Sequence, residues 1–204
     1  MSLDRPSSRI SRRGEQTREQ ILTAAKHLFT DRGYHTTSLY DLFEHAGITK
    51  GAFFHHWKSK EELALSVLDE ISRNFEEYVF VVARGEGRAR EKMERLLRNL
   101  GDLSQNQRWI YMRIFALWCT DLHPDEEKIG PAVHLLRARW TMLWKDLIHK
   151  AQQETDLRTD ISAENLSFLV SSAILGVQLM SSQPKAGSDS TKIALDTLRR
   201  ALLT

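Results

Sequence analysis

The sequence predicts an all-α protein of about nine helices, and three observations lead to this fold class. Apolar residues recur at helical spacing along most of the 204-residue chain, beginning with Ile21, Ala24 and Ala25. Ten glycines and four prolines give few breaks, so long helices are expected. Hydrophobic residues make up 41% and charged residues 27% of the chain, a composition typical of a globular protein with a sizeable core.

The composition also limits the compartment. A single cysteine, Cys119, cannot form a disulfide within its own chain, which favours a reducing cytoplasm over a secreted disulfide scaffold. The segment from Met1 to Glu15 is polar and lacks the apolar run of a signal peptide. Polar residues interrupt the uncharged run from Leu166 to Pro184. We therefore expect a cytoplasmic protein without a signal peptide or a membrane span.

Positive charge is concentrated in the first part of the chain. Residues 1–60 contain ten Lys or Arg and six Asp or Glu, a net charge of +4, whereas residues 61–204 contain nineteen and twenty-one, a net charge of −2. This asymmetry is compatible with a surface that faces a polyanion or with a solvated basic tail. We expect residues 1–14 to form a flexible basic arm.

The first helix is expected to begin at a capping box formed by Thr17 and Gln20. Gly33 is a natural left-handed stop for this helix. Between these signals, one apolar stripe follows the helical period and consists of Ile21, Ala24, Ala25, Leu28 and Phe29.

Two short helices follow at helix-turn-helix spacing. Ser38, with Asp41 three residues later, is expected to cap the second helix, and Gly47 ends it. Thr49 caps the third helix, which extends to Trp57. Because three residues separate these helices, they must meet at a sharp angle, as in a helix-turn-helix motif.

The rest of the chain is predicted to be helical. Ser59 and Glu62 form another capping box, which opens a long fourth helix that ends at the glycine-containing break 84–87. A fifth helix carries Met93, Leu96, Leu97 and Leu100. Four more helices are expected at about 107–121, 126–154, 162–182 and 190–203.

The sequence resembles the tetracycline-repressor-like (TetR) family in three segments, 36–39, 46–57 and 58–63. The resemblance covers residues 17–68 closely and the remainder in general character. It implies a three-helix DNA-binding domain over residues 15–60, and a helical ligand-binding and dimerisation domain over residues 61–204.

The resemblance also implies which residues contact DNA. The third helix enters the major groove, with Lys50 and Gly51 near base edges, and glycine lets the backbone approach the groove closely. Phosphate contacts are implied for Thr37, Thr49, His55 and Lys60. The complete set of expected DNA-binding residues is Thr37, Ser38, Thr49, Lys50, Gly51, Ala52, Phe54, His55 and Lys60.

The chain departs from the family pattern at four positions. The family usually has Tyr at position 54 and Phe at 57, whereas this chain has Phe54 and Trp57. The phenol-to-phosphate bond is therefore lost at Phe54, which either joins the core or faces the groove. Phe43 stands where the family usually has Ala, and Ala52 stands where a residue with a hydroxyl group is common. Phe53 and Trp57 are expected in the core.

No metal or cofactor is expected. His55 and His56 are adjacent, and adjacent residues of a helix point about 100° apart, so they do not form a shared ligand face. A cysteine ligand is also absent nearby.

Four of the five tryptophans fall between residues 109 and 144. From the pattern alone, this cluster is compatible with an ordinary core or with a ligand pocket. The family resemblance implies a cavity for a small apolar or aromatic molecule. Its expected lining is Trp109, Met112, Phe115, Trp118, Cys119, Trp140 and Trp144.

The last two helices are apolar enough to complete the monomer core or to pair with a second copy. The resemblance implies a homodimer, which also fits the need to place two recognition helices on one operator. The expected interface comprises Leu166, Leu169, Val170, Ala173, Ile174, Val177, Leu198 and Leu202.

Together these observations predict a homodimeric regulator that binds double-stranded DNA at a palindromic operator. We expect it to be a repressor that a small-molecule effector releases. One alternative is a DNA-binding protein without a ligand, with the aromatics as filled core. A second is a helical enzyme that uses Cys119, although the sequence has no carboxylate pair or glycine-rich phosphate loop, and no catalytic residue is predicted.

Overall fold

The computed structural model describes residues 6–103, 108–180 and 189–203, and the regular secondary structure in these ranges is all helical. Helices α4, η1 and α5 follow one another without a break, so the described residues form nine helical rods, as predicted. The elements are α1 (Pro6–Arg32), α2 (Leu39–Ala46), α3 (Lys50–His56), α4 (Lys60–Phe75), η1 (Glu76–Phe80), α5 (Val81–Arg84), α6 (Ala89–Leu103), α7 (Trp109–Asp121), α8 (Ile129–Gln153), α9 (Ala163–Met180) and α10 (Asp189–Leu203).

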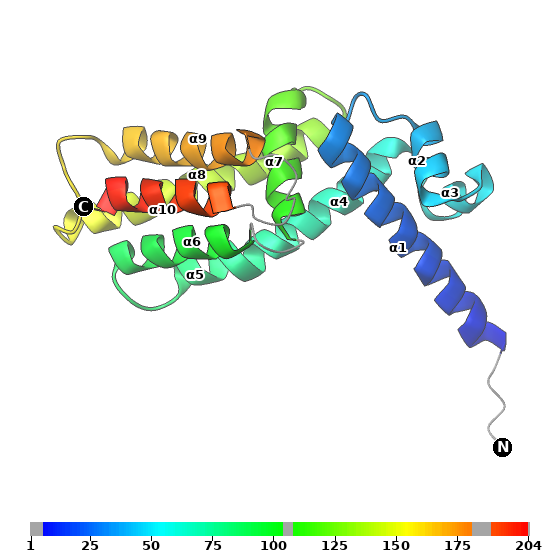
Figure 1. The fold of residues 1–204 in the computed structure, drawn as a ribbon, viewed down its shortest axis with the longest axis horizontal. Helices are drawn as coiled ribbons and strands as arrows, with labels where there is room; N and C mark the ends of the chain where they lie inside the picture. Colours follow the sequence, from blue (N-terminus) through cyan, green and yellow to red (C-terminus); the bar gives the residue numbers. More distant parts are fainter. Residues whose placement is uncertain (1–5, 104–107, 181–188, 204) are drawn as a thin grey trace, which may run out of the picture.

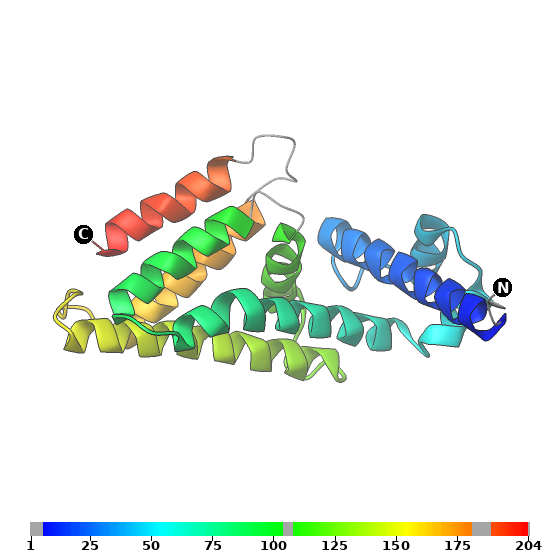
Figure 2. The same ribbon diagram turned by 90° about the horizontal axis from the view of Figure 1, so that it is seen from below.

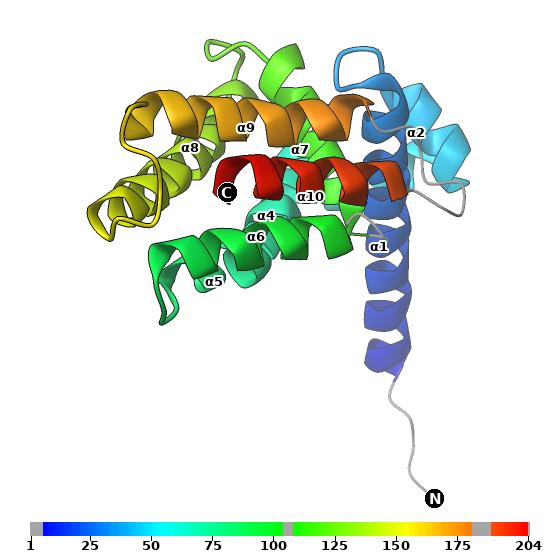
Figure 3. The same ribbon diagram turned by 60° about the vertical axis from the view of Figure 1, so that its left-hand side comes forward.

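The rods form two parts that α4 joins (Figure 1). Helices α2 and α3 lie at one end of the molecule with α1, and α4 runs from them into a bundle made of α5 to α10. Figure 2 shows α4 and α8 side by side, with α10 on the opposite side of the bundle. Helices α6, α10 and α9 lie next to one another in Figure 3.

Helix α1 is longer than the sequence predicted. It begins at Pro6, so the predicted helix start at Thr17 is wrong, and residues 6–14 of the expected arm are helical. Proline fits the first turn of a helix because its missing N–H has no intrahelical partner there. Gly14 costs a helix about 1 kcal/mol relative to alanine, which a long helix tolerates. Residues 1–5 lie outside the described residues.

One hydrophobic core continues from α1–α3 into the bundle. The ring of Phe29 on α1 lies edge-on to Trp118 on α7, with 5.5 Å between ring centroids. Through this contact, the apolar residues of α1 and those of the bundle form one continuous core. The apolar stripe predicted for α1 is buried along its whole length: Ile21, Ala24, Ala25, Leu28 and Phe29.

The long predicted fourth helix is present, but it contains a π-helical turn. Helix α4 passes into η1 at Glu76 and returns to α-helix at Val81. A π turn accommodates an extra residue within a helix, and the 3.6-residue spacing of apolar residues does not reveal it. The predicted break follows at Gly85, where α5 ends.

The later helices begin and end within a few residues of the predicted bounds. Helix α7 covers 109–121 against a predicted 107–121, and α8 covers 129–153 against 126–154. Helix α9 ends at Met180; the predicted loop from Pro184 lies mostly outside the described residues.

Helix α9 is long and apolar enough to cross a membrane by length and composition, with a mean hydropathy of 1.3. This criterion is weak evidence, because the core helix of a soluble protein also meets it. One face of α9, including Val170 and Ile174, is buried in the core of the bundle, against α8 and α7.

Candidate nucleic-acid interface

The helix-turn-helix is built by the local signals that the sequence contains. The Asp41 N–H donates to the Ser38 hydroxyl at 3.1 Å, and the Ser38 N–H donates to the Asp41 carboxylate at 2.9 Å. Gly47 ends α2 in the left-handed conformation with φ 62°, which glycine adopts without strain. The Ala52 N–H donates to the Thr49 hydroxyl at 3.2 Å and starts α3. The predicted caps of both helices are therefore confirmed.

The inner face of α3 is anchored by aromatic side chains. Phe53 is fully buried and Trp57 is 3% exposed, so both predictions of core positions are confirmed. The ring of Phe53 packs against Phe43 on α2 at a centroid distance of 5.5 Å. The indole N–H of Trp57 donates to the Ser66 hydroxyl on α4 at 2.9 Å. These contacts fix α3 against both α2 and α4.

The outer face of α3 presents a cation, a glycine and an aromatic ring to solvent. Lys50, Gly51 and His55 are exposed, and Phe54 is 43% exposed. The Lys50 ammonium lies 5.9 Å from the centroid of the Phe54 ring. Phe54 therefore belongs to the exposed face of α3, which settles the two alternatives left open by the sequence. Ala52 is half-buried.

Two implied phosphate contacts face inward instead. Thr37 is fully buried, and its hydroxyl donates to the Gly33 carbonyl at 2.8 Å. The Lys60 ammonium donates to the carbonyls of Tyr34 and Thr37, each at 2.9 Å, and lies 4.3 Å from the Tyr34 ring centroid. Burial lowers the pKa of Lys60 below its usual value. In this structure, both side chains hold the α1–α2 connection and neither is free to reach a phosphate.

Two further residues beside α3 and α2 were missed by the sequence reasoning. The Arg18 guanidinium on α1 lies 5.3 Å from the centroid of the Trp57 ring, and this brings a cation to α3. Tyr40 on α2 is 67% exposed, and its hydroxyl donates to Glu44 at 2.7 Å. A signal for Arg18 was its position one turn before Ile21, on the side of α1 that carries the apolar stripe, whereas Tyr40 had none beyond its place on α2.

A buried polar contact joins the helix-turn-helix unit to the bundle. The Lys26 ammonium on α1 donates to the Glu70 carboxylate on α4 at 2.8 Å, and these side chains are 12% and 16% exposed. The Tyr111 hydroxyl on α7 donates to the same carboxylate at 3.2 Å. Burial alone lowers the pKa of Lys26, but the hydrogen bond and charge of Glu70 more than offset this and raise it above its usual value. Three helices thus meet at one carboxylate.

A second set of contacts joins the same parts at the other end of α7. Tyr34 lies in the α1–α2 connection, and its N–H donates to the carboxylate of Asp121, the last residue of α7, at 3.2 Å. His35 lies 3.2 Å from Glu126 in the α7–α8 connection. The Glu61 carboxylate on α4 accepts from the N–H of Ile129, at the first residue of α8. The start of α4 is thereby tied to the start of α8.

The predicted pocket residues fall into different places. Phe115, Trp140 and Trp144 are fully buried, and Phe75 of α4 packs against Phe115 at 4.9 Å and Trp140 at 5.5 Å. Trp118 instead packs toward α1, against Phe29. Buried indole N–H groups without a hydrogen-bond partner among the described residues belong to Trp118, Trp140 and Trp144.

The remaining members of the predicted pocket are less enclosed. Met112 is 2% exposed, whereas Trp109 and Cys119 are half-buried. Burial raises the pKa of the Cys119 thiol to about 12. Trp109 lines a hollow of about 950 Å³ between α1, α4 and α7, together with Lys26 and Tyr111. The other predicted pocket residues do not line this hollow.

The predicted pairing surface needs a correction. Leu166, Val170 and Ile174 are at most 3% exposed, because this side of α9 packs into the protomer's own core. Leu202 is also buried, whereas Ala173, Val177 and Leu198 are half-buried. Leu169 is 57% exposed and belongs to an apolar outer face that the sequence reasoning largely missed. Its other large members are Phe168 at 70%, Met180 at 86% and, on α10, Ile193 at 62% exposure.

Comparisons with known proteins agree with this geometry. The family model described as "Bacterial regulatory proteins, tetR family" matches residues 21–67, from α1 into α4. The "HTH-type transcriptional repressor KstR2" of Mycolicibacterium smegmatis is 38% identical over 80 residues, which are 39% of this chain and 35% of that protein. The KstR2 protein of Rhodococcus jostii is 29% identical over 154 residues, which are 72% of this chain and 71% of that protein.

The fold of the whole chain also has a solved counterpart. The crystal structure of AibR in complex with isovaleryl coenzyme A and operator DNA has a TM-score of 0.77 at 18% identity, covering 92% of this chain and 98% of that one. Fold and site define an all-helical protein that carries an N-terminal helix-turn-helix unit. Residues 21–67 match the tetR family of bacterial regulatory proteins, and the similarity to the Rhodococcus jostii protein extends beyond this segment over 72% of the chain.

Proposed function

We propose that this protein is a DNA-binding transcriptional regulator whose α3 enters the major groove. The observation that carries the proposal is the two-sided character of α3: Phe53 is buried with its ring against α2, while Lys50, Gly51 and Phe54 are exposed. A buried anchor holds a helix in place, and its exposed cation and apolar ring suit base edges and the thymine methyl group. We place the DNA-binding unit over residues 15–60.

The names of the similar proteins support this proposal. The KstR2 relatives are named transcriptional repressors, and AibR was crystallised with operator DNA. By analogy, we propose repression as the output of this chain and the cytoplasm as its location.

The first test is a selection of bound sequences from a pool of random duplexes, at physiological salt. A dimeric sequence reader selects a palindrome whose half-sites lie about 34 Å, one DNA turn, or a multiple of this apart. Salt-sensitive retention without sequence preference would overturn the proposal, because a basic surface alone binds phosphates in this way.

We further propose that two copies pair through the outer faces of α9 and α10. Phe168, Leu169 and Met180 give α9 a large exposed apolar surface, and Ile193 extends it onto α10. Monomeric proteins rarely expose a large continuous apolar patch. Two helices from each copy can cover this patch by forming a four-helix contact. We assign dimerisation and ligand binding to residues 61–204.

The effector is proposed to be a small apolar or aromatic molecule that binds within the bundle. The support is the set of buried indole N–H groups on Trp140 and Trp144, since buried donors usually have an acceptor. A titration of tryptophan fluorescence and of operator affinity with a panel of such molecules tests this. If none changes either signal, the aromatics are filled core and the ligand-independent alternative holds.

The contacts between α1, α4, α7 and α8 offer a path from effector to DNA. Glu61 at the start of α4 is tied to the start of α8, and Asp121 at the end of α7 holds the connection that precedes α2. A ligand that shifts α7 or α8 therefore moves the start of α4 and the connection before α2, because these hydrogen bonds join them. The position of α3, which lies between α2 and α4 in the chain, changes with them.

An enzyme that uses Cys119 is the least supported alternative. The thiolate is the reactive form of cysteine, and a pKa of about 12 leaves very little of it at neutral pH.

A further inference from the structure

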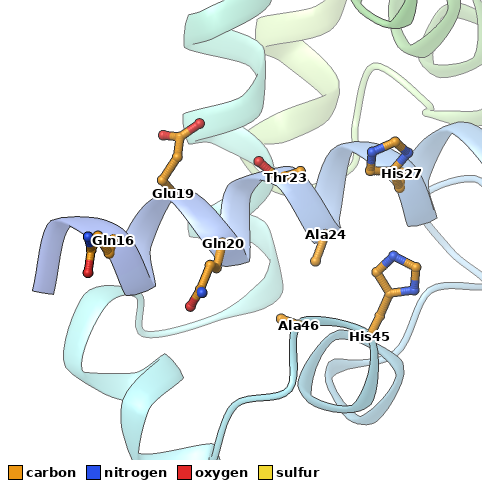
Figure 4. Close-up of a pocket in the computed structure, with 8 residues that line it drawn as sticks. All are labelled: Gln16, Glu19, Gln20, Thr23, Ala24, His27, His45 and Ala46. Atoms are coloured by element: carbon orange, nitrogen blue, oxygen red, sulfur yellow. The ribbon is translucent and has the colours of Figure 1, made fainter. Parts of the chain in front are cut away.

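Two histidines face each other across a groove between α1 and α2. His27 lies in the second half of α1, and His45 lies in the last turn of α2. Their ring centroids are 6.3 Å apart, with 39° between the ring planes. Figure 4 shows both imidazoles at one end of a hollow of about 660 Å³. Both side chains are exposed, so an ion can reach them from solvent.

The distance between the rings fits one shared metal ion. Metal–imidazole bonds are about 2.0–2.1 Å long, so two imidazoles on one ion have ring centroids at most about 6.5 Å apart. The observed 6.3 Å lies within this limit. This distance fits two imidazoles on opposite sides of a square-planar or octahedral ion, and rotation of the two exposed side chains toward each other gives the shorter distance of a tetrahedral site.

The backbone fixes the positions from which the two side chains extend. Buried Ala24 and Leu28 flank His27 in the sequence of helix α1 and anchor it in the core. The capping box at Ser38 and the left-handed Gly47 fix both ends of the helix that carries His45. His45 also lies at a helix C-terminus, where the helix dipole favours a cation.

Polar side chains and two alanines line the rest of the hollow. Its lining includes the carboxylate of Glu19, the hydroxyl of Thr23 and the amides of Gln16 and Gln20 (Figure 4). Among these groups, Thr23 lies one helical turn before His27, where its hydroxyl can hydrogen-bond to a water molecule bound to the ion. Groups of three or more His, Cys, Asp or Glu side chains that could hold a metal ion are absent from the described part of the chain, so an ion here has no third ligand of these types.

We propose that His27 and His45 together bind one divalent transition-metal ion, of the Ni²⁺, Cu²⁺ or Zn²⁺ class that imidazole favours, with water as the remaining ligands. The ion bridges α1 and α2 and restrains the unit that carries α3. The sequence reasoning predicted no metal site because it considered the adjacent pair His55–His56, whereas this pair is 18 residues apart in sequence.

Calorimetric titration of the untagged full chain with NiCl₂, in the absence of DNA, tests the site. We expect one ion per chain, and both His27→Ala and His45→Ala should weaken its affinity at least tenfold. The matched control is His149→Ala, because His149 is an exposed histidine on the distant helix α8. Loss of affinity in the control, or unchanged affinity in either groove variant, would overturn the assignment.

Two further measurements remain informative if a variant folds poorly. Electron paramagnetic resonance of the wild-type chain with one equivalent of Cu²⁺ should show two bound nitrogens; a single nitrogen contradicts the proposal. Saturating Ni²⁺ should raise the Tm of the wild-type chain but not that of His27→Gln, since an ion that binds only the folded state stabilises it. Equal shifts in both proteins would also count against the site.

Discussion

At the scale of single residues, lysines of the helix-turn-helix unit have different roles. Lys50 is exposed beside Phe54 on the outer face of α3, whereas Lys60 donates to two main-chain carbonyls. The family resemblance alone placed both of them at DNA. The contacts within the protein separate an exposed lysine, which we propose reads base edges, from a lysine that holds the main chain.

Lys50→Ala should weaken binding to the selected operator by about tenfold to a hundredfold, since a side chain that reads a base edge contributes about 1–3 kcal/mol. Affinity for a scrambled duplex should fall much less. Fluorescence anisotropy with both duplexes measures the two losses. Lys145→Ala, on α8, is the control and should leave both affinities unchanged; equal losses on both duplexes for Lys50→Ala would contradict base reading.

Lys60→Met should lower the free energy of unfolding by about 1–3 kcal/mol, because the carbonyls of Tyr34 and Thr37 lose a charged donor. Lys58→Met, at an exposed lysine two residues earlier, should change it by less than about 0.5 kcal/mol. Urea denaturation gives both values. The opposite result would be a Lys60→Met variant of full stability whose DNA binding depends less on salt, by about one unit of slope. That result would show that Lys60 contacts a phosphate in the wild-type complex.

At the scale of helices, local signals predicted what they control. The Ser38–Asp41 box, the left-handed Gly47 and the Thr49 cap involve neighbouring residues, so their spacing shows in the sequence. The predicted start of α1 at Thr17 was wrong because a capping-box sequence can also occur within a continuous helix. The π turn from Glu76 was missed because it leaves the apolar pattern intact on both sides.

Periodicity shows which residues of a helix are apolar but not what they pack against. On α9 it predicted one pairing face, whereas the structure contains two apolar faces. Val170 is buried in the protomer, and the adjacent Leu169 is 57% exposed. The assignment to core or partner depends on α7 and α8, whose positions no local pattern gives.

These adjacent residues allow a matched test of the pairing surface. Leu169→Glu should convert the dimer to monomer in sedimentation velocity while the helical circular dichroism and Tm stay near wild type, because the charge disrupts only the outer face. Val170→Glu should unfold the chain, since it places an unpaired charge in the core. A Leu169→Glu protein that remains dimeric would move the interface away from this part of α9.

At the scale of the whole molecule, the feature least visible in the sequence was the contact of Lys26, Glu70 and Tyr111 between the helix-turn-helix unit and the bundle. We call this contact the joint. Lys26 and Glu70 are separated by 44 residues, and Tyr111 follows 41 residues after Glu70. Neither spacing is a local signal, so only the fold brings these groups together. The same holds for Glu61 and the start of α8.

Glu70→Gln should destabilise the protein by about 3 kcal/mol, because the mostly buried Lys26 ammonium loses its counter-charge. The double variant Lys26→Met/Glu70→Leu should recover much of this loss, since no unpaired charge remains. Urea denaturation of the single and double variants measures the coupling. If the double variant is as unstable as Glu70→Gln, packing at the joint matters more than charge.

The same pair predicts how stability depends on pH. Glu70 raises the folded-state pKa of Lys26 above the usual 10.5, so its contribution is fully present below that value. As the pH rises from 10.5 through the folded-state pKa, Lys26 loses its proton and the contribution disappears. The wild-type free energy of unfolding should therefore fall over this alkaline range by more than that of the Lys26→Met/Glu70→Leu variant, whose joint carries no titrating pair. Parallel urea titrations between pH 8 and the alkaline limit of folding make the comparison, and identical pH profiles would show that the joint is not held by this charge.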